Sequence, residues 1–277
     1  MSETEYLYRY TTLENLAATL KYHTIRLNPL DKMDDLQEQK TQDVENIGKF
    51  IFISSWTAEA EEDIPMWKMY TDMKSGVRIK LPKNPFKRRG TRAEEYARAT
   101  GFPLKSEKGS VDELDTFLDL SILAQMDAFS PQAWSGEILH QVQYTTDKNL
   151  LEPHICSVKD GTVNLNIEKL GKYKNTYWQF QKEWRYIMMF MRLVIRPDLA
   201  TTPRELALSV NRMAKGTELP PFRHFDLEID PKYFAEMEIT PSPQMTPGNR
   251  IILDTLVERY NPAATIKESE LKNLIYV

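Results

Sequence analysis

The stretch QKEWR, residues 181–185, places an amide, a carboxylate and a guanidinium at alternate positions. It leads into an apolar run of strand-forming residues that ends at Met191. Residues two apart on an extended strand face the same side, so Gln181, Glu183 and Arg185 are predicted to form one polar face. Charges at the mouth of a buried strand are costly unless they are paired. These groups therefore form a structural ion pair or point at a ligand.

A second charged group lies in the first predicted strand, where Arg9 stands between Tyr8 and Tyr10. An arginine in an otherwise apolar strand needs a carboxylate, a phosphate or carbonyl groups as partners. The structural interpretation is a buried pair with Glu183 or Asp35. The functional interpretation is a clamp for a pyrophosphate.

Hydroxyl side chains close the predicted buried strand 49–57, in the order Ser54-Ser55-Trp56-Thr57. Serine and threonine are common where a strand enters a turn, so the plain interpretation is a turn. In the functional interpretation the hydroxyls support a ligand ribose or a catalytic carboxylate by hydrogen bonds.

Local patterns predict the elements that position these groups. We expect strands at 5–10, 23–29, 49–57, 75–82, 136–145, 183–191, 224–230, 236–242 and 264–277, and helices at 13–22, 64–72, 111–126, 169–181, 202–214 and 250–260. The pattern favours one mixed α+β domain over residues 1–277, with a charged insertion around 83–135.

Three of the predicted helices carry more specific expectations. A capping box from Thr11 to Glu14 begins helix 13–22. Hydrophobic spacing places apolar residues on one face of each of the other two helices. In helix 64–72 this face holds Met66, Met69 and Tyr70. In helix 250–260 it holds Ile251, either Leu253 or Ile252, Leu256 and Tyr260.

Composition narrows the class of protein. The chain has 277 residues, 41% hydrophobic and 27% charged, as in ordinary globular domains. A net charge of −4 and a pI of about 5.7 do not indicate a protein built around nucleic-acid phosphates, although they allow a local basic groove. The opening MSETEYLYRY is not a signal-peptide pattern, and no apolar run approaches the roughly 18–20 residues of a membrane helix. We expect a cytoplasmic protein without membrane contact.

Other sites have little support in the sequence. The single cysteine, Cys156, excludes an intramolecular disulfide and is more simply a packing residue than a nucleophile. The histidines of the chain lack the spacing of a metal site, so we expect no metal ion. They are His23, His140, His154 and His224. A basic run around Phe86 contacts phosphates or forms a solvated loop: Lys83, Lys87, Arg88, Arg89 and Arg92.

The order of Arg9, a serine-rich strand end and Gln181-x-Glu183 resembles the arginine–serine–glutamate class of ADP-ribosyltransferases. The opening YRYTTLENLAATLKYHTIRLNP is also similar to the strand–helix–strand opening of that superfamily. The resemblance implies that Arg9 binds the NAD phosphates and that Ser54 or Ser55 supports the site. It also implies that Glu183 binds the nicotinamide ribose and that Gln181 faces the acceptor. The serine motif reads S-S-W here, where the family has S-T-S.

A longer resemblance covers nearly the whole chain. The segments LYRY, RLNP with DDLQE, SSW, MWKMY, GVRI, EWRY and IKESEL resemble, in order and rough spacing, a bacterial family called domain of unknown function 2971. Of that family's loop and glutamate–arginine motifs, Asp35, Glu38, Glu183 and Arg185 are kept. Gln181 replaces the first glutamate. The resemblance implies an effector with a role in phage defence or toxicity.

Together the resemblances imply an ADP-ribosyltransferase-like fold with a central, mostly antiparallel split sheet flanked by helices. NAD is then the substrate, and the acceptor is a protein, a nucleic-acid base or water. The implied catalytic residues are Glu183, Gln181 and Arg185, with Arg185 orienting Glu183. The implied nucleotide-binding residues are Arg9, Tyr8, Tyr10, Thr11, Asn28, Asp35, Ser54, Ser55, Trp56, Trp67 and Tyr70.

Three other functions fit the same residues, and the sequence predicts no oligomeric state. A sensor could bind a nucleotide in the same pocket without catalysis. An interaction protein could hold Arg9, Glu183 and Arg185 as a buried ion network. A metal-dependent nuclease would place carboxylates around Mg²⁺. These carboxylates are Asp34, Asp35, Glu38 and Glu183.

Overall fold

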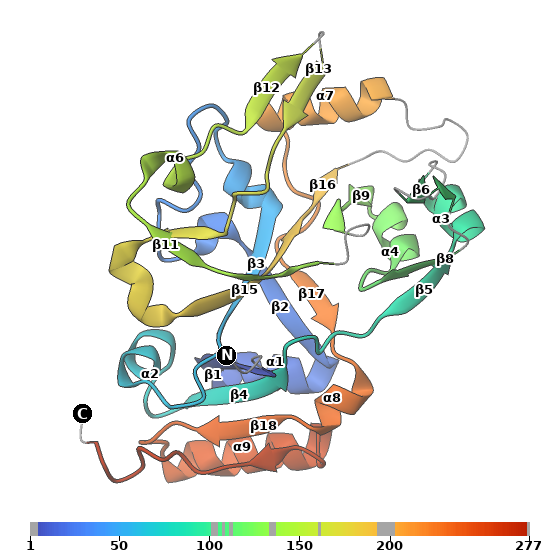
Figure 1. Ribbon diagram of the computed structural model, residues 1–277. Coiled ribbons are helices and arrows are strands. Elements are labelled where there is room, and N and C mark those ends of the chain that lie inside the picture. Colours follow the sequence, from blue (N-terminus) through green and yellow to red (C-terminus); the bar gives the residue numbers. More distant parts are fainter. Residues whose placement is uncertain are drawn as a thin grey trace.

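A nine-stranded, mostly antiparallel sheet runs through the centre of the molecule (Figure 1). Its strands are β1 (Tyr6–Thr12), β2 (Thr24–Pro29), β3 (Ile51–Thr57), β4 (Gly76–Pro82), β10 (Leu139–Gln141), β15 (Glu183–Met189), β17 (Phe225–Glu228), β18 (Glu238–Pro241) and β19 (Thr265–Ile266). They follow the order β10-β15-β3-β1-β4-β18-β19, with β2 paired to β3 and β17 to β2. The computed structural model describes residues 5–100, 105–106, 109–110, 113–132, 137–159, 162–192 and 203–275.

Helices and short strands surround this sheet. The helices are α1 (Leu13–Tyr22), α2 (Ile64–Tyr70), α3 (Ala93–Thr100), α4 (Leu120–Gln125), α6 (Lys148–Leu151), α7 (Pro203–Ala214), α8 (Pro231–Ala235) and α9 (Pro247–Tyr260), with 3₁₀ turns η1 (Leu30–Lys32), η2 (Ile47–Phe50) and η3 (Thr176–Gln181). The two-stranded sheets pair β11 (Gln143–Thr145) with β14 (Tyr173–Asn175), β12 (Cys156–Lys159) with β13 (Thr162–Leu165), β16 (Met191–Arg192) with β9 (Ala128–Phe129), β5 (Arg89–Arg92) with β8 (Glu113–Thr116), and β6 (Lys105–Ser106) with β7 (Gly109–Ser110). The fold is α+β, as predicted. Among the described residues, no helix has the length and apolar character needed to cross a membrane.

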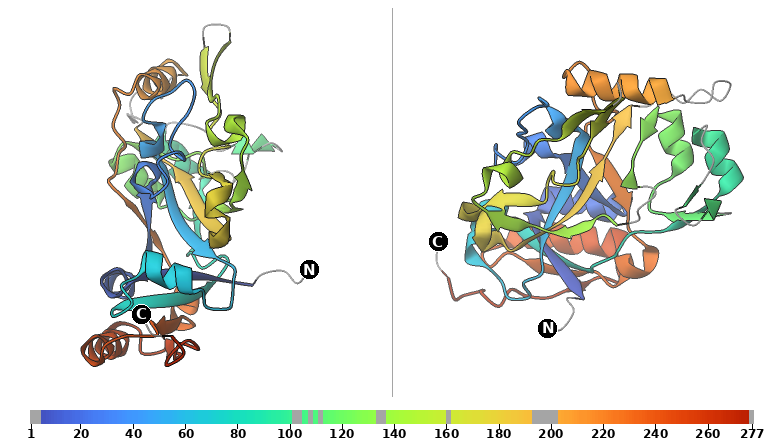
Figure 2. Two further views of the ribbon diagram at one scale, coloured as in Figure 1. Left: turned by 90° about the vertical axis from the view of Figure 1, so that its left-hand side faces the viewer. Right: turned by 45° about the horizontal axis from the view of Figure 1, so that its top comes forward.

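The sheet has two halves that meet at one point. β1 pairs with β4 along its whole length, but it shares only the pair Tyr8–Thr57 with β3. In Figure 1, β3 and β15 pass obliquely through the middle of the molecule, while β4 and β18 lie across its lower part. The side view in Figure 2 shows the same crossing. The strands β1 and β3 therefore diverge on one side of this pair.

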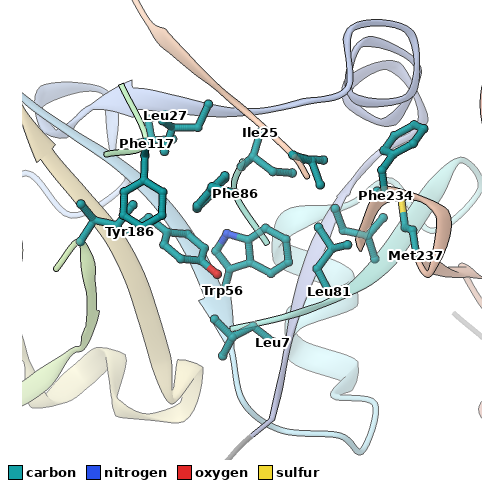
Figure 3. Packing of buried hydrophobic residues seen from close by; sticks show 14 of the residues in the cluster. Leu7, Ile25, Leu27, Trp56, Leu81, Phe86, Phe117, Tyr186, Phe234 and Met237 are labelled. Atoms are coloured by element: carbon teal, nitrogen blue, oxygen red, sulfur yellow. The ribbon is translucent and has the colours of Figure 1, made fainter. Parts of the chain in front are cut away.

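Alternating side chains divide the core between the two faces of the sheet. On β15, Tyr186 and Met188 pack into the larger hydrophobic cluster, and Ile187 and Met189 pack into a smaller one. Figure 3 shows Trp56 and Tyr186 beside Phe86 and Phe117 in the larger cluster. Glu183 and Arg185 share a face with Ile187 and Met189, because residues two apart on a strand face the same side.

The charged insertion packs onto the same core rather than forming a separate one. Phe86, Phe117 and Leu123 all belong to the larger cluster. Its strands β5 and β8 pair with each other and not with the central sheet. Part of the predicted range 83–135 lies outside the described residues.

Most predicted elements are confirmed, but four were wrong in part. The range 111–126, whose first two residues lie outside the described ones, contains strand β8 before helix α4. The range 169–181 contains strand β14 and then η3. Strand 136–145, described from residue 137 on, is interrupted at Val142, whose N–H donates to the Glu183 carbonyl at 2.9 Å. Beyond β19, the chain end forms turns up to the last described residue, 275. In the first two of these ranges, pairing of β8 with β5 and of β14 with β11 overrides the local preference for helix.

The predicted helix start needs correction, and the structure also shows which residues of α2 and α9 are buried. Thr12, not Thr11, caps α1, since its hydroxyl accepts from the Asn15 N–H at 3.2 Å while β1 continues through residue 12. In α2 the buried residue is Trp67 and Met69 is exposed. In α9 the buried residues are Leu253 and Val257, whereas Ile251 and Ile252 are exposed.

The orientation of α9 can be tested by two substitutions on the same helix. Leu253→Ala removes a fully buried side chain, so it should lower the free energy of unfolding by about 2–5 kcal/mol. Ile251→Ala, at a position that is 67% exposed, should change it by less than about 0.5 kcal/mol. Urea unfolding followed by circular dichroism measures both. Equal losses would contradict this orientation.

Candidate functional site

A cleft of about 220 Å³ lies where β1 and β3 diverge. The residues that would have continued the pairing of these two strands line the cleft instead. It brings together most of the predicted site residues: Tyr8, Arg9, Tyr10, Asn28, Ser54, Ser55, Trp56, Tyr70, Gln181, Glu183 and Arg185. The resemblance to ADP-ribosyltransferases requires Arg9, a serine and Glu183 to share one cleft, and they do.

Three predicted site residues do not line this cleft. Thr11 lines a smaller cavity beyond Arg9. The Asp35 carboxylate is buried and accepts from the Gln37 N–H at 2.9 Å. Trp67 is buried behind the cleft wall, where its ring meets that of Tyr10 edge to face at 4.9 Å. These residues support the cleft or its surroundings.

Two carboxylates and two cations form a buried charge network on the wall of the cleft: Glu38, Lys174, Glu183 and Arg185. Arg185 donates from Nε to one oxygen of Glu183 at 2.7 Å and from its terminal nitrogen to the other at 3.1 Å. Lys174 Nζ lies 3.1 Å from Glu183 Oε2 and 3.2 Å from Glu38 Oε1. Arg185 also contacts Glu38 and donates to a backbone carbonyl. The formal charges of the network sum to zero.

Gln181 extends this network toward the cleft. Its carbonyl oxygen accepts from Lys174 Nζ at 2.7 Å, and its amide nitrogen donates to the Tyr70 hydroxyl. Burial, followed by the negative charge of Glu183, raises the pKa of Tyr70, so the phenol keeps its proton at neutral pH. Among the described residues, no acceptor for that proton is seen, which leaves it able to bind a ligand.

The predicted polar face of Gln181, Glu183 and Arg185 does form, but these residues do not lie on one continuous strand. Gln181 ends the turn η3 and Glu183 begins β15, so the two do not share one strand. Lys182 lies between them with φ of 44°, in the left-handed region. This turn brings both side chains into the cleft while the Lys182 side chain points out and pairs with Glu59 at 2.8 Å.

Opposing effects set the charge of Glu183. Burial raises the pKa of its carboxyl, but the positive charges of Arg185 and Lys174 outweigh burial and hold the pKa well below its usual range. The Ser55 hydroxyl also donates to this carboxylate. Ser54 also lines the cleft, but its hydroxyl accepts from Trp56 Nε1 at 3.0 Å. Ser55 is therefore the serine that contacts Glu183.

Arg9 differs from Arg185 because it has no carboxylate beside it. Among the described residues, no ion pair or hydrogen bond of its guanidinium is seen, and its nearest aromatic partner is Trp56, with the ring centroid 6.0 Å away. Burial, followed by the positive charge of Arg26, lowers the pKa of Arg9 to about 10. The predicted structural pair with Glu183 or Asp35 does not form. Arg9 stays cationic at neutral pH and faces the cleft.

Sequence reasoning missed Lys174, which completes the charge network, and gave Glu38 only a role in metal binding. It also missed the cleft residues Lys32 and Met66, and it gave Asp34, which lines the cleft, only a role in metal binding. No periodic pattern marks Lys174, because its partners lie on η3, β15 and the loop before η2. A signal did exist for Glu38, since it belongs to the acidic loop that the longer resemblance preserves.

The carboxylates of the nuclease alternative are not arranged around a metal position. Glu38 and Glu183 are each neutralised by Arg185 and Lys174. Within the described ranges, no group of three or more histidine, cysteine, aspartate or glutamate side chains is placed to hold a metal ion.

Comparison of the chain with protein-family models, with curated proteins and with solved structures gave no match. The two family resemblances therefore stay predictions, and the geometry of the cleft carries the functional argument.

The charge network predicts a large stability difference between two single substitutions. Lys174→Met leaves an uncompensated negative charge in the interior, so it should lower the free energy of unfolding by about 3–5 kcal/mol. Glu59→Gln breaks the exposed pair with Lys182 and should cost less than about 1 kcal/mol. Chemical denaturation measures both. A small loss for Lys174→Met would show that this network is not needed for folding.

Acid should weaken the fold through Glu183. Because the pKa of Glu183 is lower in the folded chain than its ordinary value of 4.5, the unfolded chain binds this proton first as the pH falls. The stabilisation is complete above about pH 5 and declines below it, by up to about 1.4 kcal/mol per pH unit. Glu183→Gln should remove this part of the slope in urea unfolding between pH 5 and pH 3. An unchanged slope would contradict the assignment.

Proposed function

We propose that the cleft binds NAD and that the protein cleaves the bond between nicotinamide and ribose, as an ADP-ribosyltransferase or an NAD glycohydrolase. The observation that carries this proposal is Arg9, a cation that has no ion pair or hydrogen bond among the described residues and that lies in the same cleft as Ser55 and Glu183. A guanidinium binds the paired oxygens of a phosphate with two parallel hydrogen bonds. In this assignment, Arg9 binds the NAD pyrophosphate.

The other cleft residues suit a ring and a sugar. Tyr8 and Tyr70 keep part of their rings exposed, and stacking on such rings is favourable for a nicotinamide. The Tyr70 hydroxyl and Asn28 offer polar contacts to a ribose or an amide. A cavity of about 220 Å³ suits one end of a dinucleotide, with the remainder extending past Arg9.

The sheet provides a second line of support. Its two halves diverge beside the pair Tyr8–Thr57, and the cleft lies in the opening. This arrangement agrees with the split sheet that the resemblance to ADP-ribosyltransferases implies. It also explains why Arg9 and Ser55, on neighbouring strands, have room for a ligand between them.

The chemistry requires no metal. The bond from the nicotinamide nitrogen to C1′ of the ribose breaks, and its electron pair leaves with nicotinamide. C1′ then carries oxocarbenium-like positive charge, as in glycoside hydrolysis. The ionised Glu183 stabilises this charge. The acceptor, a protein side chain, a base or water, forms the new bond to C1′ and loses a proton.

A second candidate function is nucleotide sensing without catalysis, and one feature of Glu183 favours it. A carboxylate offers about four positions for hydrogen bonds. Two donors of Arg185, with Lys174 and Ser55, already occupy them in this conformation. In the catalytic proposal the Ser55 hydroxyl rotates away and a ribose hydroxyl replaces it. In the sensor, Glu183 holds the wall of the cleft and touches no ligand.

Arg9 gives the cleanest test because, within the described part of the chain, its guanidinium has no ion pair or hydrogen bond that a substitution would break. Arg9→Gln should weaken NAD binding by about tenfold to a hundredfold, since hydrogen bonds to charged groups contribute about 1.5–3 kcal/mol. The same variant should keep or raise the melting temperature, because it removes a partly buried charge that has no ion pair or hydrogen bond among the described residues. Isothermal titration calorimetry and thermal melting measure the two effects. The control, Arg250→Gln, breaks exposed pairs on α9 and should leave NAD binding unchanged.

Nicotinamide release from NAD by the wild-type protein separates the two candidates. Release that Arg9→Gln reduces supports the enzyme. Binding of NAD without release, with or without added protein or nucleic acid, supports the sensor. Absence of both binding and release would reject both functions. Glu183→Gln is a poor catalytic test, because it also leaves Arg185 and Lys174 unpaired in the interior.

A further inference from the structure

A second concave site adjoins the cleft. This basic groove, with a volume of about 580 Å³, is lined by the end of β2, η1, Lys49 of η2, Arg192 of β16 and the segment 219–223. Lys32 lines both the groove and the cleft, so the two are neighbours. The NAD proposal assigns no role to this groove.

Four cations face one carboxylate in the basic groove. The cations are Lys32, Lys49, Arg192 and Arg223, and the carboxylate is Asp31. Lys32 Nζ is 3.9 Å from Asp31, the outer limit of an ion pair, and the Lys32 side chain is 71% exposed. Among the described residues, the side chains of the other three cations have no ion pair or hydrogen bond. The groove therefore carries a net positive charge in a chain whose formal net charge is −4.

The basic run that the sequence suggested for phosphate binding differs from the groove, because four of its five cations are paired with carboxylates. Lys87 and Arg89 pair with Glu228, Arg88 with Asp115 and Arg92 with Glu95, while Lys83 lies over the Trp184 ring. Like charges left together without partners repel each other and do not help folding. The groove cations are therefore better explained by an anionic ligand than by stability.

We propose that the basic groove binds the phosphate backbone of single-stranded nucleic acid. Several cations spread along a groove suit a chain of phosphates better than one small anion. Leu219, Pro220 and Pro221 add apolar surface beside the cations, against which bases and sugars can pack. Because Lys32 joins the groove to the cleft, a base of the bound strand lies near the aromatic side chains of the cleft.

The shape of the site selects a single strand over a duplex. Duplex readers insert a protruding helix or ribbon into a groove of the nucleic acid. Here the protein surface is hollow, so it receives a thin, flexible strand instead. The proposal stands independently of NAD binding, since Lys49 and Arg223 do not line the cleft.

Fluorescence anisotropy with a labelled single-stranded oligonucleotide of 12 thymidines, titrated at several salt concentrations, tests the proposal. The wild-type chain should bind, with affinity that falls as salt rises. The double variant Lys49→Gln/Arg223→Gln should weaken binding about tenfold and reduce the salt slope by about 1.4, because each lost phosphate contact removes about 0.7. Its NAD binding and melting temperature should stay at the wild-type values.

The matched control is the double variant Lys21→Gln/Arg259→Gln, which removes two exposed cations from α1 and α9. It should bind the oligonucleotide like the wild type. Three outcomes would each overturn the proposal: no binding by the wild type at 25 mM salt, an equal loss in the control, or equally tight binding of a duplex or of polyglutamate. A loss confined to the groove variant, with NAD binding unchanged, supports it.

Discussion

The bidentate ion pair between Glu183 and Arg185 is the interaction on which the cleft depends. Both groups are buried, so the pair is stable only if its remaining hydrogen-bonding positions are filled. Lys174 and Glu38 fill them, and Lys174 also holds Gln181. Four separate segments of the chain are thereby fixed against one wall. A buried network of this kind seldom stabilises a fold more than apolar packing would. Its effect here is to hold Gln181, Tyr70 and Ser55 in one geometry.

The same cleft contains two arginines in opposite electrostatic situations. Arg185 is surrounded by negative charge, which outweighs burial and raises its pKa. Arg9 is desolvated without a carboxylate beside it, and its pKa is lowered. A partly buried arginine that has no ion pair or hydrogen bond among the described residues carries a cost in stability. Such costs are typical of sites that bind a ligand.

The sequence was sufficient to predict the central strands and the polar cluster on β15, because alternation along a strand is a local signal. It was not sufficient to find Lys174, which lies in a segment whose composition favours a helix but which pairs as β14. Nor did it show which cations stay unpaired. The basic run 83–92 looked suited to phosphate, yet carboxylates such as Glu228 pair with four of its five cations. Lys49, Arg192 and Arg223 are scattered in the sequence, and only the fold brings them to one groove.

A crystal structure of the chain with NAD would test the central claim most directly. We expect a phosphate oxygen of NAD within hydrogen-bond distance of the Arg9 guanidinium, with the nicotinamide ribose beside Ser55 and with the pair between Glu183 and Arg185 intact. A phosphate bound to Arg185 with that pair broken, or NAD bound away from the cleft, would contradict the account.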